Sequence, residues 1–138
     1  MYRITSNEAL TEHLARQGDF ALARVEGLRL PKELPPSMAQ ATFVNCLFAP
    51  GSVMPEDLSD ALFVACRMSG LAFRNANLFG ARFKSCDLSD SHFRDCNMAA
   101  TAFDDCAIET ITVRRCDLDG SSISEQFAEP ILDCEEAA

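Results

Sequence analysis

The chain has 138 residues, a net charge of −9 at pH 7 and 48% hydrophobic residues. This length predicts one domain, and no run of about eighteen apolar residues is present to form a membrane-spanning helix. The acidic balance disfavours binding to the phosphates of nucleic acid, so we expect no direct nucleic-acid ligand and no membrane partner.

The first 35 residues predict a capping segment with one helix. Thr5-Ser6-Asn7-Glu8 fits a capping box, and Leu10 and Leu14 follow at the i, i+4 spacing of one helix face. We predict a helix from about Ser6 to Gln17. Three prolines between residues 31 and 36 end regular structure before the next segment begins.

From residue 43 to residue 123 an apolar side chain recurs at every fifth position, and a small residue usually stands two positions earlier. Neither an α-helix, with a period of 3.6 residues, nor a strand, with a period of two, produces this spacing. The recurring residues are Phe43, Phe48, Val53, Leu58, Phe63, Met68, Phe73, Leu78, Phe83, Leu88, Phe93, Met98, Phe103, Ile108, Val113, Leu118 and Ile123.

Each pentapeptide is interpreted as one short side of a coil. Residues two apart on an extended segment point to the same face, so the small and the large residue both face inward. Stacked coils form parallel ladders about 4.8 Å apart, and one coil alone cannot bury its own core. We therefore predict an interior filled by the recurring side chains.

A second period, of twenty residues, predicts the number of sides. Four sides of five residues place related positions in one column, whereas a three-sided coil with a period of fifteen would scatter them. The sets with this spacing are Cys46, Cys66, Cys86 and Cys106; Arg74, Arg94 and Arg114; Asn77 and Asn97; and, in the same column as these asparagines, Asp57 and Asp117.

Several repeats match the pattern A(D/N)LXX, namely Ala76-Asn77-Leu78, Cys86-Asp87-Leu88, Cys96-Asn97-Met98 and Cys116-Asp117-Leu118. On these repeats the chain resembles the pentapeptide-repeat proteins over roughly residues 36–125. The resemblance implies an all-β fold, a right-handed quadrilateral parallel β-helix of about four coils, here with a short N-terminal α-helical cap. The predicted division is a capping segment (1–35), the β-helix (36–125) and a C-terminal cap or tail (126–138).

The tail leaves two alternatives open. Phe127, Ile131 and Leu132 either cover the last coil or dock on a second copy. In the quinolone-resistance branch of the family, C-terminal elements join two coils end to end. A homodimer through the C-terminal end is therefore one of the two predictions.

The seven cysteines are predicted to be reduced rather than bridged. Six occupy the inward small position, where cysteine behaves as a small apolar residue, and Cys134 lies outside the phase. Stacked cysteines have parallel side chains, which disfavours disulfides, and no C-x-x-C pair is present to suggest zinc. We expect no metal and no cofactor.

The charge is concentrated in residues 86–138, which carry thirteen acids against three arginines. One interpretation is a set of solvated faces, and the other is a recognition surface for a charged partner. The candidate partner-binding residues are the basic Arg74, Arg94, Arg114 and Arg115 and the acidic Asp87, Asp90, Asp104, Asp105, Glu109, Asp117 and Asp119.

No catalytic site is predicted. His13 and His92 are the two histidines, and they form no Ser-His-Asp or Cys-His constellation with the rest of the sequence. Asp104 and Asp105 are adjacent, but a filled coil offers no pocket to raise the pKa of one of them. The chain is predicted not to be an enzyme.

We predict a non-catalytic protein-interaction module with an unknown protein partner. The resemblance adds two alternatives: an acidic nucleic-acid mimic acting on a type II topoisomerase, as in quinolone-resistance relatives, and a bacterial effector delivered into a host. The N-terminus carries no basic, apolar, cleavable segment, so we expect a bacterial cytoplasmic location, with delivery as an effector still open.

Overall fold

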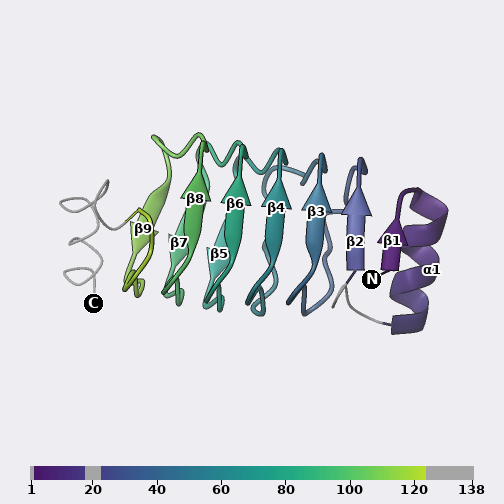
Figure 1. Cartoon of the computed structure of the whole chain (residues 1–138), viewed down its shortest axis with the longest axis horizontal. Helices are drawn as coiled ribbons and strands as arrows, with labels where there is room; N and C mark the ends of the chain where they lie inside the picture. The colour runs from purple at the N-terminus through teal and green to yellow at the C-terminus, as the bar shows by residue number, and fades with distance from the viewer. Residues whose placement is uncertain (1, 18–22, 124–138) are drawn as a thin grey trace.

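The computed structural model describes residues 2–17 and 23–123. Its strands lie side by side along the long axis of the molecule, and the helix lies beyond the first strand at one end (Figure 1). The elements are β1 (Tyr2–Ile4), α1 (Asn7–Gln17), β2 (Ala23–Glu26), β3 (Thr42–Val44), β4 (Leu62–Val64), β5 (Ala72–Arg74), β6 (Arg82–Lys84), β7 (His92–Arg94), β8 (Ala102–Asp104) and β9 (Thr112–Arg114).

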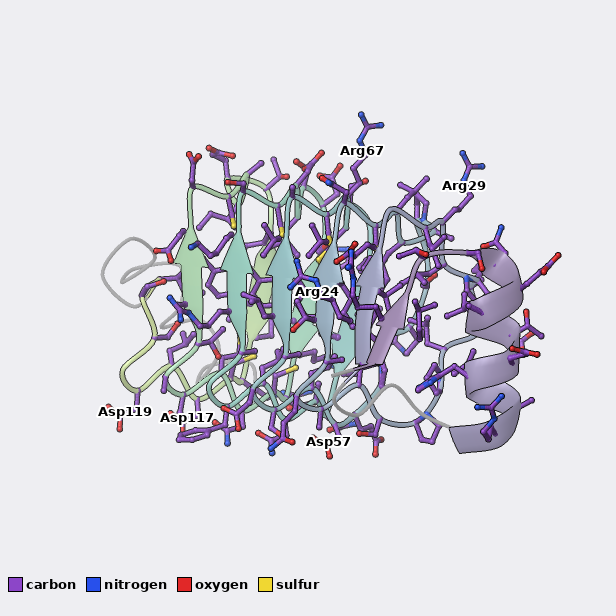
Figure 2. All side chains as sticks on the ribbon, turned by 45° about the vertical axis from the view of Figure 1, so that its right-hand side comes forward. Arg24, Arg29, Asp57, Arg67, Asp117 and Asp119 are labelled. Atoms are coloured by element: carbon purple, nitrogen blue, oxygen red, sulfur yellow. The ribbon has the colours of Figure 1, made fainter. Side chains whose placement is uncertain are left out.

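Parallel pairing between residues twenty apart builds four ladders, one on each side of the coil, which confirms the predicted four sides. The strands β1-β2-β3-β4-β6-β8 form one sheet, and β5-β7-β9 form a second sheet across the coil. Single bridges hold the other two sides, for example between Arg67 and Asp87 and between Asn97 and Asp117. Side chains of these two sides point in opposite directions, with Arg67 at one edge and Asp117 at the other (Figure 2).

The solenoid has about five turns, so the prediction of about four coils is too low. The extra turn begins at β2, where Val25 lies opposite Phe43, eighteen residues further along the chain. This spacing is shorter than the period of twenty, and the five-residue pattern therefore does not reveal the turn. β1 extends the same sheet by one more strand. The predicted division at residues 35 and 125 stays a prediction.

Residues with a left-handed backbone form the corners of the coil. From residue 60 to residue 105, every fifth residue has a φ between 52° and 72°. Gly70 and Gly80 adopt this conformation without steric cost, and Asp and Asn tolerate it better than other side chains do. Ala65 and Ala100 also adopt it, although alanine has no side-chain group to offset the strain.

The five-residue phase slips once, at Pro50. Its ring fixes φ near −65°, so Pro50 cannot take the left-handed corner, and Gly51 takes it instead with a φ of 86°. The inward residues shift with it, because Ser52 and Met54 are buried while Val53 is 57% exposed. The prediction that Val53 faces the core is therefore wrong, and the phase is restored at Leu58.

Stacked phenylalanine rings fill the interior, as predicted. Rings twenty residues apart lie nearly parallel, with centroids 4.3 to 5.2 Å apart, which is contact distance. Such spacing leaves no room for a ligand between successive rings. The two columns are Phe43, Phe63, Phe83 and Phe103 on one side and Phe73 and Phe93, followed by Val113, on the other.

The N-terminal helix is confirmed, with a cap one residue later than the sequence suggested. The Ser6 hydroxyl oxygen, rather than that of Thr5, accepts a hydrogen bond from the Ala9 N–H at 3.1 Å. Leu10 is buried within the core cluster, while α1 lies at the end of the solenoid (Figure 1). This position agrees with the predicted role of a cap over an otherwise exposed slice of core.

Replacing Phe83 by alanine tests the stacked core. Phe83 is fully buried between Phe63 and Phe103, so Phe83→Ala should lower the free energy of unfolding by about 3–5 kcal/mol in urea titrations. Phe79 is 49% exposed, and Phe79→Ala is the control, with a much smaller expected effect. Equal losses for the two variants would contradict the filled interior.

Replacing Ala65 by glycine tests the corner conformation. At a φ of 53° the change relieves steric strain, so Ala65→Gly should raise the free energy of unfolding by about 0.5–1 kcal/mol. Ala61 is buried at the inward small position and has no positive φ, so Ala61→Gly should destabilise the protein instead. Thermal melts that show destabilisation in both variants would contradict the left-handed corner.

Candidate interaction faces

The outer face of β5, β7 and β9, here called the arginine face, carries Arg74, Arg94 and Arg114 in one column. The three residues are direct neighbours in the parallel ladder, and all three are exposed. Adjacent strands place their backbones about 4.8 Å apart. The structure thus brings together the basic residues that the twenty-residue period predicted to stack.

A second column runs beside the arginines, two positions earlier in each strand, and consists of Ala72, His92 and Thr112. Between the two columns lies a shallow groove of about 180 Å³. The groove and the part of Thr112 in it were missed from the sequence, although the signal was present. The positions two residues before the three arginines are also twenty residues apart, so the sequence could have predicted that Ala72, His92 and Thr112 form a column of their own.

Asp95 is the acidic residue next to the arginine face, and its carboxylate is paired with Arg115. The Arg115 guanidinium donates a hydrogen bond to one carboxylate oxygen of Asp95 at 3.1 Å, and its Nε lies 2.8 Å from the other oxygen in an ion pair. Arg94 reaches Asp95 only at 4.0 Å. Arg74 and Arg114 form no ion pair with any residue in the described part of the chain. The arginine face therefore keeps most of its positive charge.

Two other basic residues of the solenoid lie opposite acids in the ladders. Lys84 lies opposite Asp104 in the ladder of β6 and β8, and Arg67 lies opposite Asp87. Like charges that face each other across neighbouring strands are destabilising, so this alternation favours the fold.

One further pair of stacked arginines is neutralised in a different way. Arg3 and Arg24 are neighbours in the ladder of β1 and β2, and the Glu26 carboxylate binds both. The hydrogen bonds from Arg24 and Arg3 hold the pKa of Glu26 below its usual range. The arginine face has no such carboxylate of its own.

Two of the acidic candidates have a structural task. The Asp87 carboxylate accepts hydrogen bonds from the Ser89 N–H and hydroxyl, and Asp117 accepts one from the Asp119 N–H at 3.0 Å. Such bonds to the residue two positions later stabilise the turn that follows. The bonds from Ser89 also lower the pKa of Asp87.

The acidic candidates are divided among three sides and do not form one cluster. Asp104 and Asp105 end the side of β8, Asp87, Asp90 and Glu109 lie on the next side, and Asp117 and Asp119 lie on the last. Asp90, Asp105 and Arg115 are left-handed corner residues, so their backbone conformation contributes to the fold whatever they bind. Their role in binding a partner stays a prediction.

The cysteines of the described residues are free thiols, in agreement with the sequence interpretation. Each thiol donates to backbone carbonyls of its own and the preceding coil, as Cys86 does to Phe63 at 3.3 Å. The contact with the neighbouring Cys86 thiol and burial both raise the pKa of Cys106, and the contact with Cys96 and burial raise that of Cys116. The raised pKa values keep the Cys106 and Cys116 thiols protonated, whereas the same contacts lower the pKa values of their partners Cys86 and Cys96.

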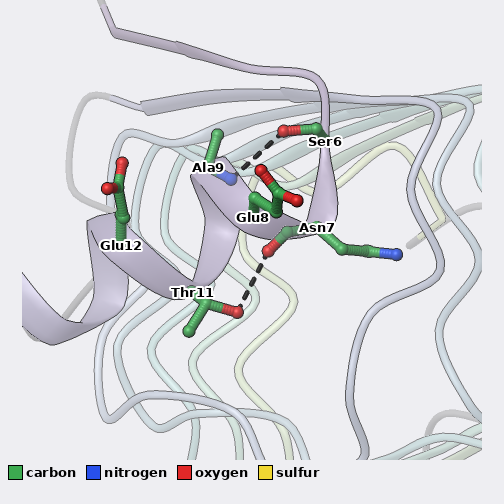
Figure 3. Close-up of a pocket in the computed structure, with 6 residues that line it drawn as sticks. All are labelled: Ser6, Asn7, Glu8, Ala9, Thr11 and Glu12. Atoms are coloured by element: carbon green, nitrogen blue, oxygen red, sulfur yellow. Dashed lines mark hydrogen bonds between the residues drawn. The ribbon is translucent and has the colours of Figure 1, made fainter.

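A further surface hollow lies against the first turn of α1 (Figure 3). Its polar groups are largely engaged in the helix, since the Thr11 hydroxyl donates to the Asn7 carbonyl and Ser6 caps the helix. Within residues 2–17 and 23–123, no three His, Cys, Asp or Glu side chains are grouped to hold a metal ion. No helix in the same ranges is both long and apolar enough to cross a membrane.

Residues 57–95 match the family profile of pentapeptide repeats, in eight copies. These residues belong to the pentapeptide-repeat family. The same twenty-residue ladders continue on both sides of the matched segment, from β3 to β9. No curated protein matches the chain in sequence.

Several solved pentapeptide-repeat structures are similar to this chain. QnrB1, a plasmid-mediated fluoroquinolone resistance protein, is 24% identical with a TM-score of 0.48, and the match covers 72% of this chain and 47% of QnrB1. Rfr23 from the cyanobacterium Cyanothece 51142 is 16% identical with a TM-score of 0.42, over 84% of this chain and 90% of Rfr23. A thylakoid-lumen protein of Arabidopsis thaliana is 15% identical with a TM-score of 0.33, over 61% of this chain and 63% of its own.

This chain therefore spans about half the length of QnrB1.

Proposed function

We propose that this protein is a non-catalytic interaction module that presents charged faces of a rigid solenoid to a protein partner. The observation that carries the proposal is the filled interior. Phe43, Phe63, Phe73, Phe83 and Phe93 are fully buried and stacked ring on ring. Binding therefore falls to the outer faces, where the charged residues lie.

The arginine face is the best candidate among these faces. It is a regular sheet surface, its three arginines are exposed and in register, and a groove runs beside them. A like-charged row costs stability, and natural proteins retain such costs mostly where function requires them. The partner expected from this charge is an acidic surface.

Charge reversal on the arginine face tests the proposal. The variant with Arg74, Arg94 and Arg114 changed to Glu should lose at least one specific partner in pull-downs from the source cells, because its face would repel an acidic surface. The control changes the exposed Arg29, Lys32 and Arg82 to Glu away from this face, which alters the net charge equally and should keep that partner. Identical partner sets for wild type and the first variant would contradict the proposal.

The distribution of acids supports a second candidate, a nucleic-acid mimic acting on a type II topoisomerase. Exposed carboxylates of Asp87, Asp104, Asp105, Glu109 and Asp119 lie on the outer sides of the C-terminal coils. An acidic wall of this kind attracts surfaces that bind phosphates. Against this candidate, the acids are spread over three sides and an arginine column lies on the fourth.

A supercoiling assay with DNA gyrase separates the two candidates. A mimic should inhibit supercoiling or protect the enzyme from a quinolone at micromolar protein, and changing Asp104 and Asp105 to Asn should weaken that effect. The interaction module without mimicry predicts no change in supercoiling. An effect that survives these two substitutions would show that this part of the acidic wall is not the active surface.

A further inference from the structure

We propose that the arginine face binds a phosphate monoester group, seated in the groove between the column of Arg74, Arg94 and Arg114 and the column that ends in Thr112. This inference rests on the proposed function and specifies the chemistry of the partner at that face. The group would be a phosphorylated side chain of the partner protein. Free phosphate carries the same chemistry, and the experiment below separates the two sources.

The first argument is the unbalanced charge of the ladder. Arg74, Arg94 and Arg114 stack directly on one another, whereas Lys84 is stacked on Asp104 and the Arg3–Arg24 pair shares Glu26. Three neighbouring cations without their own acid favour a ligand that brings negative charge.

The second argument is that the nearest acid is already engaged. Asp95 is bound through both carboxylate oxygens by Arg115 and lies 4.0 Å from Arg94. Arg94 therefore retains guanidinium N–H donors for a ligand, and Arg74 and Arg114 pair with no acid among the described residues. If Asp95 neutralised the arginine face instead, its carboxylate would lie closer to Arg94 than to Arg115.

The third argument is the size of the groove. Its volume of about 180 Å³ is below the roughly 300–1,000 Å³ of sites that enclose a whole small molecule. A single tetrahedral group fits such a space while the molecule that carries it stays outside. This favours a charged group displayed by a larger partner.

The fourth argument concerns the donors around the groove. Guanidinium groups match the oxygens of a phosphate in pairs, and Thr112 and His92, which also carry polar side chains, line the same groove. A carboxylate carries one negative charge and two oxygens, whereas a phosphate monoester carries nearly two charges and three free oxygens. Three arginines in one column suit the phosphate better.

The experiment uses the full chain and follows His92 by NMR. His92 is exposed and lines the groove, whereas His13 is buried in α1 and does not line it. The two imidazole signals therefore distinguish local binding from a global change. The probes are inorganic phosphate, a phosphothreonine peptide and the same peptide without phosphate, each at constant ionic strength set with chloride. We expect a saturable shift of the His92 signal with both phosphate probes and none with the unmodified peptide or chloride.

Two variants locate the site. Arg94→Gln removes the central guanidinium and should weaken the affinity for the phosphopeptide at least about tenfold, the effect of losing a charge-assisted hydrogen bond. Arg82→Gln removes an exposed arginine from β6 on another sheet and should leave the affinity unchanged. Circular dichroism confirms that each variant keeps its fold. An absent His92 shift, or equal affinities for wild type and Arg94→Gln, would overturn the proposal.

The two sources of phosphate are separated by their affinities. Tighter binding of the phosphopeptide than of inorganic phosphate supports a phosphate carried by a partner, whereas equal affinities overturn that assignment in favour of free phosphate. The pull-down with the charge-reversed variant tests the proposed function independently of the phosphate measurements. A partner lost there without any phosphate binding would refute only the phosphate chemistry, not the interaction module.

Discussion

The left-handed residue at most corners of the coil, unbroken at every fifth position from residue 60 to residue 105, is the constraint on which the rest of the structure depends. It turns the chain so that each side is only a few residues long and the same positions face inward in every coil. Phe63 and Phe83 then stack with centroids 4.9 Å apart, close to the spacing of the parallel ladder. Backbone pairing and side-chain stacking therefore share one repeat distance, and each coil is stabilised by its neighbours.

The same repeat fixes the exterior. A residue placed at an outward position is stacked on its equivalents twenty residues away, so one sequence choice becomes a column of like side chains. In some charged columns the sign alternates, as with Lys84 and Asp104. In the arginine column like charges are direct neighbours and repel each other, as with Arg94 between Arg74 and Arg114. The arginine column is thus a local cost within an otherwise balanced surface, and this makes it the part of the exterior most informative about function.

Much of the architecture was predictable from the sequence, because the period of five and the period of twenty both follow from geometry. The four ladders, the stacked phenylalanines and the helix near Asn7–Gln17 were predicted correctly. The slip at Val53 was not, since counting apolar positions ignores the fixed φ of Pro50. The first turn at β2 was missed because its spacing to β3 is eighteen residues. The arginine column was predicted, whereas the groove and the pairing of Asp95 with Arg115 depend on side-chain directions that the period does not specify.

The central claim is that the recurring apolar side chains pile up inside a four-sided coil whose neighbouring turns are twenty residues apart. Backbone NOEs from an assigned NMR spectrum test it most directly. The account predicts a continuous series of contacts at a separation of twenty, including Leu62 with Arg82 and His92 with Thr112, together with slow exchange of the Arg82 amide that donates to Ala61. A series of NOE contacts at a separation of fifteen residues, or NOEs between the phenylalanine rings and water, would contradict it.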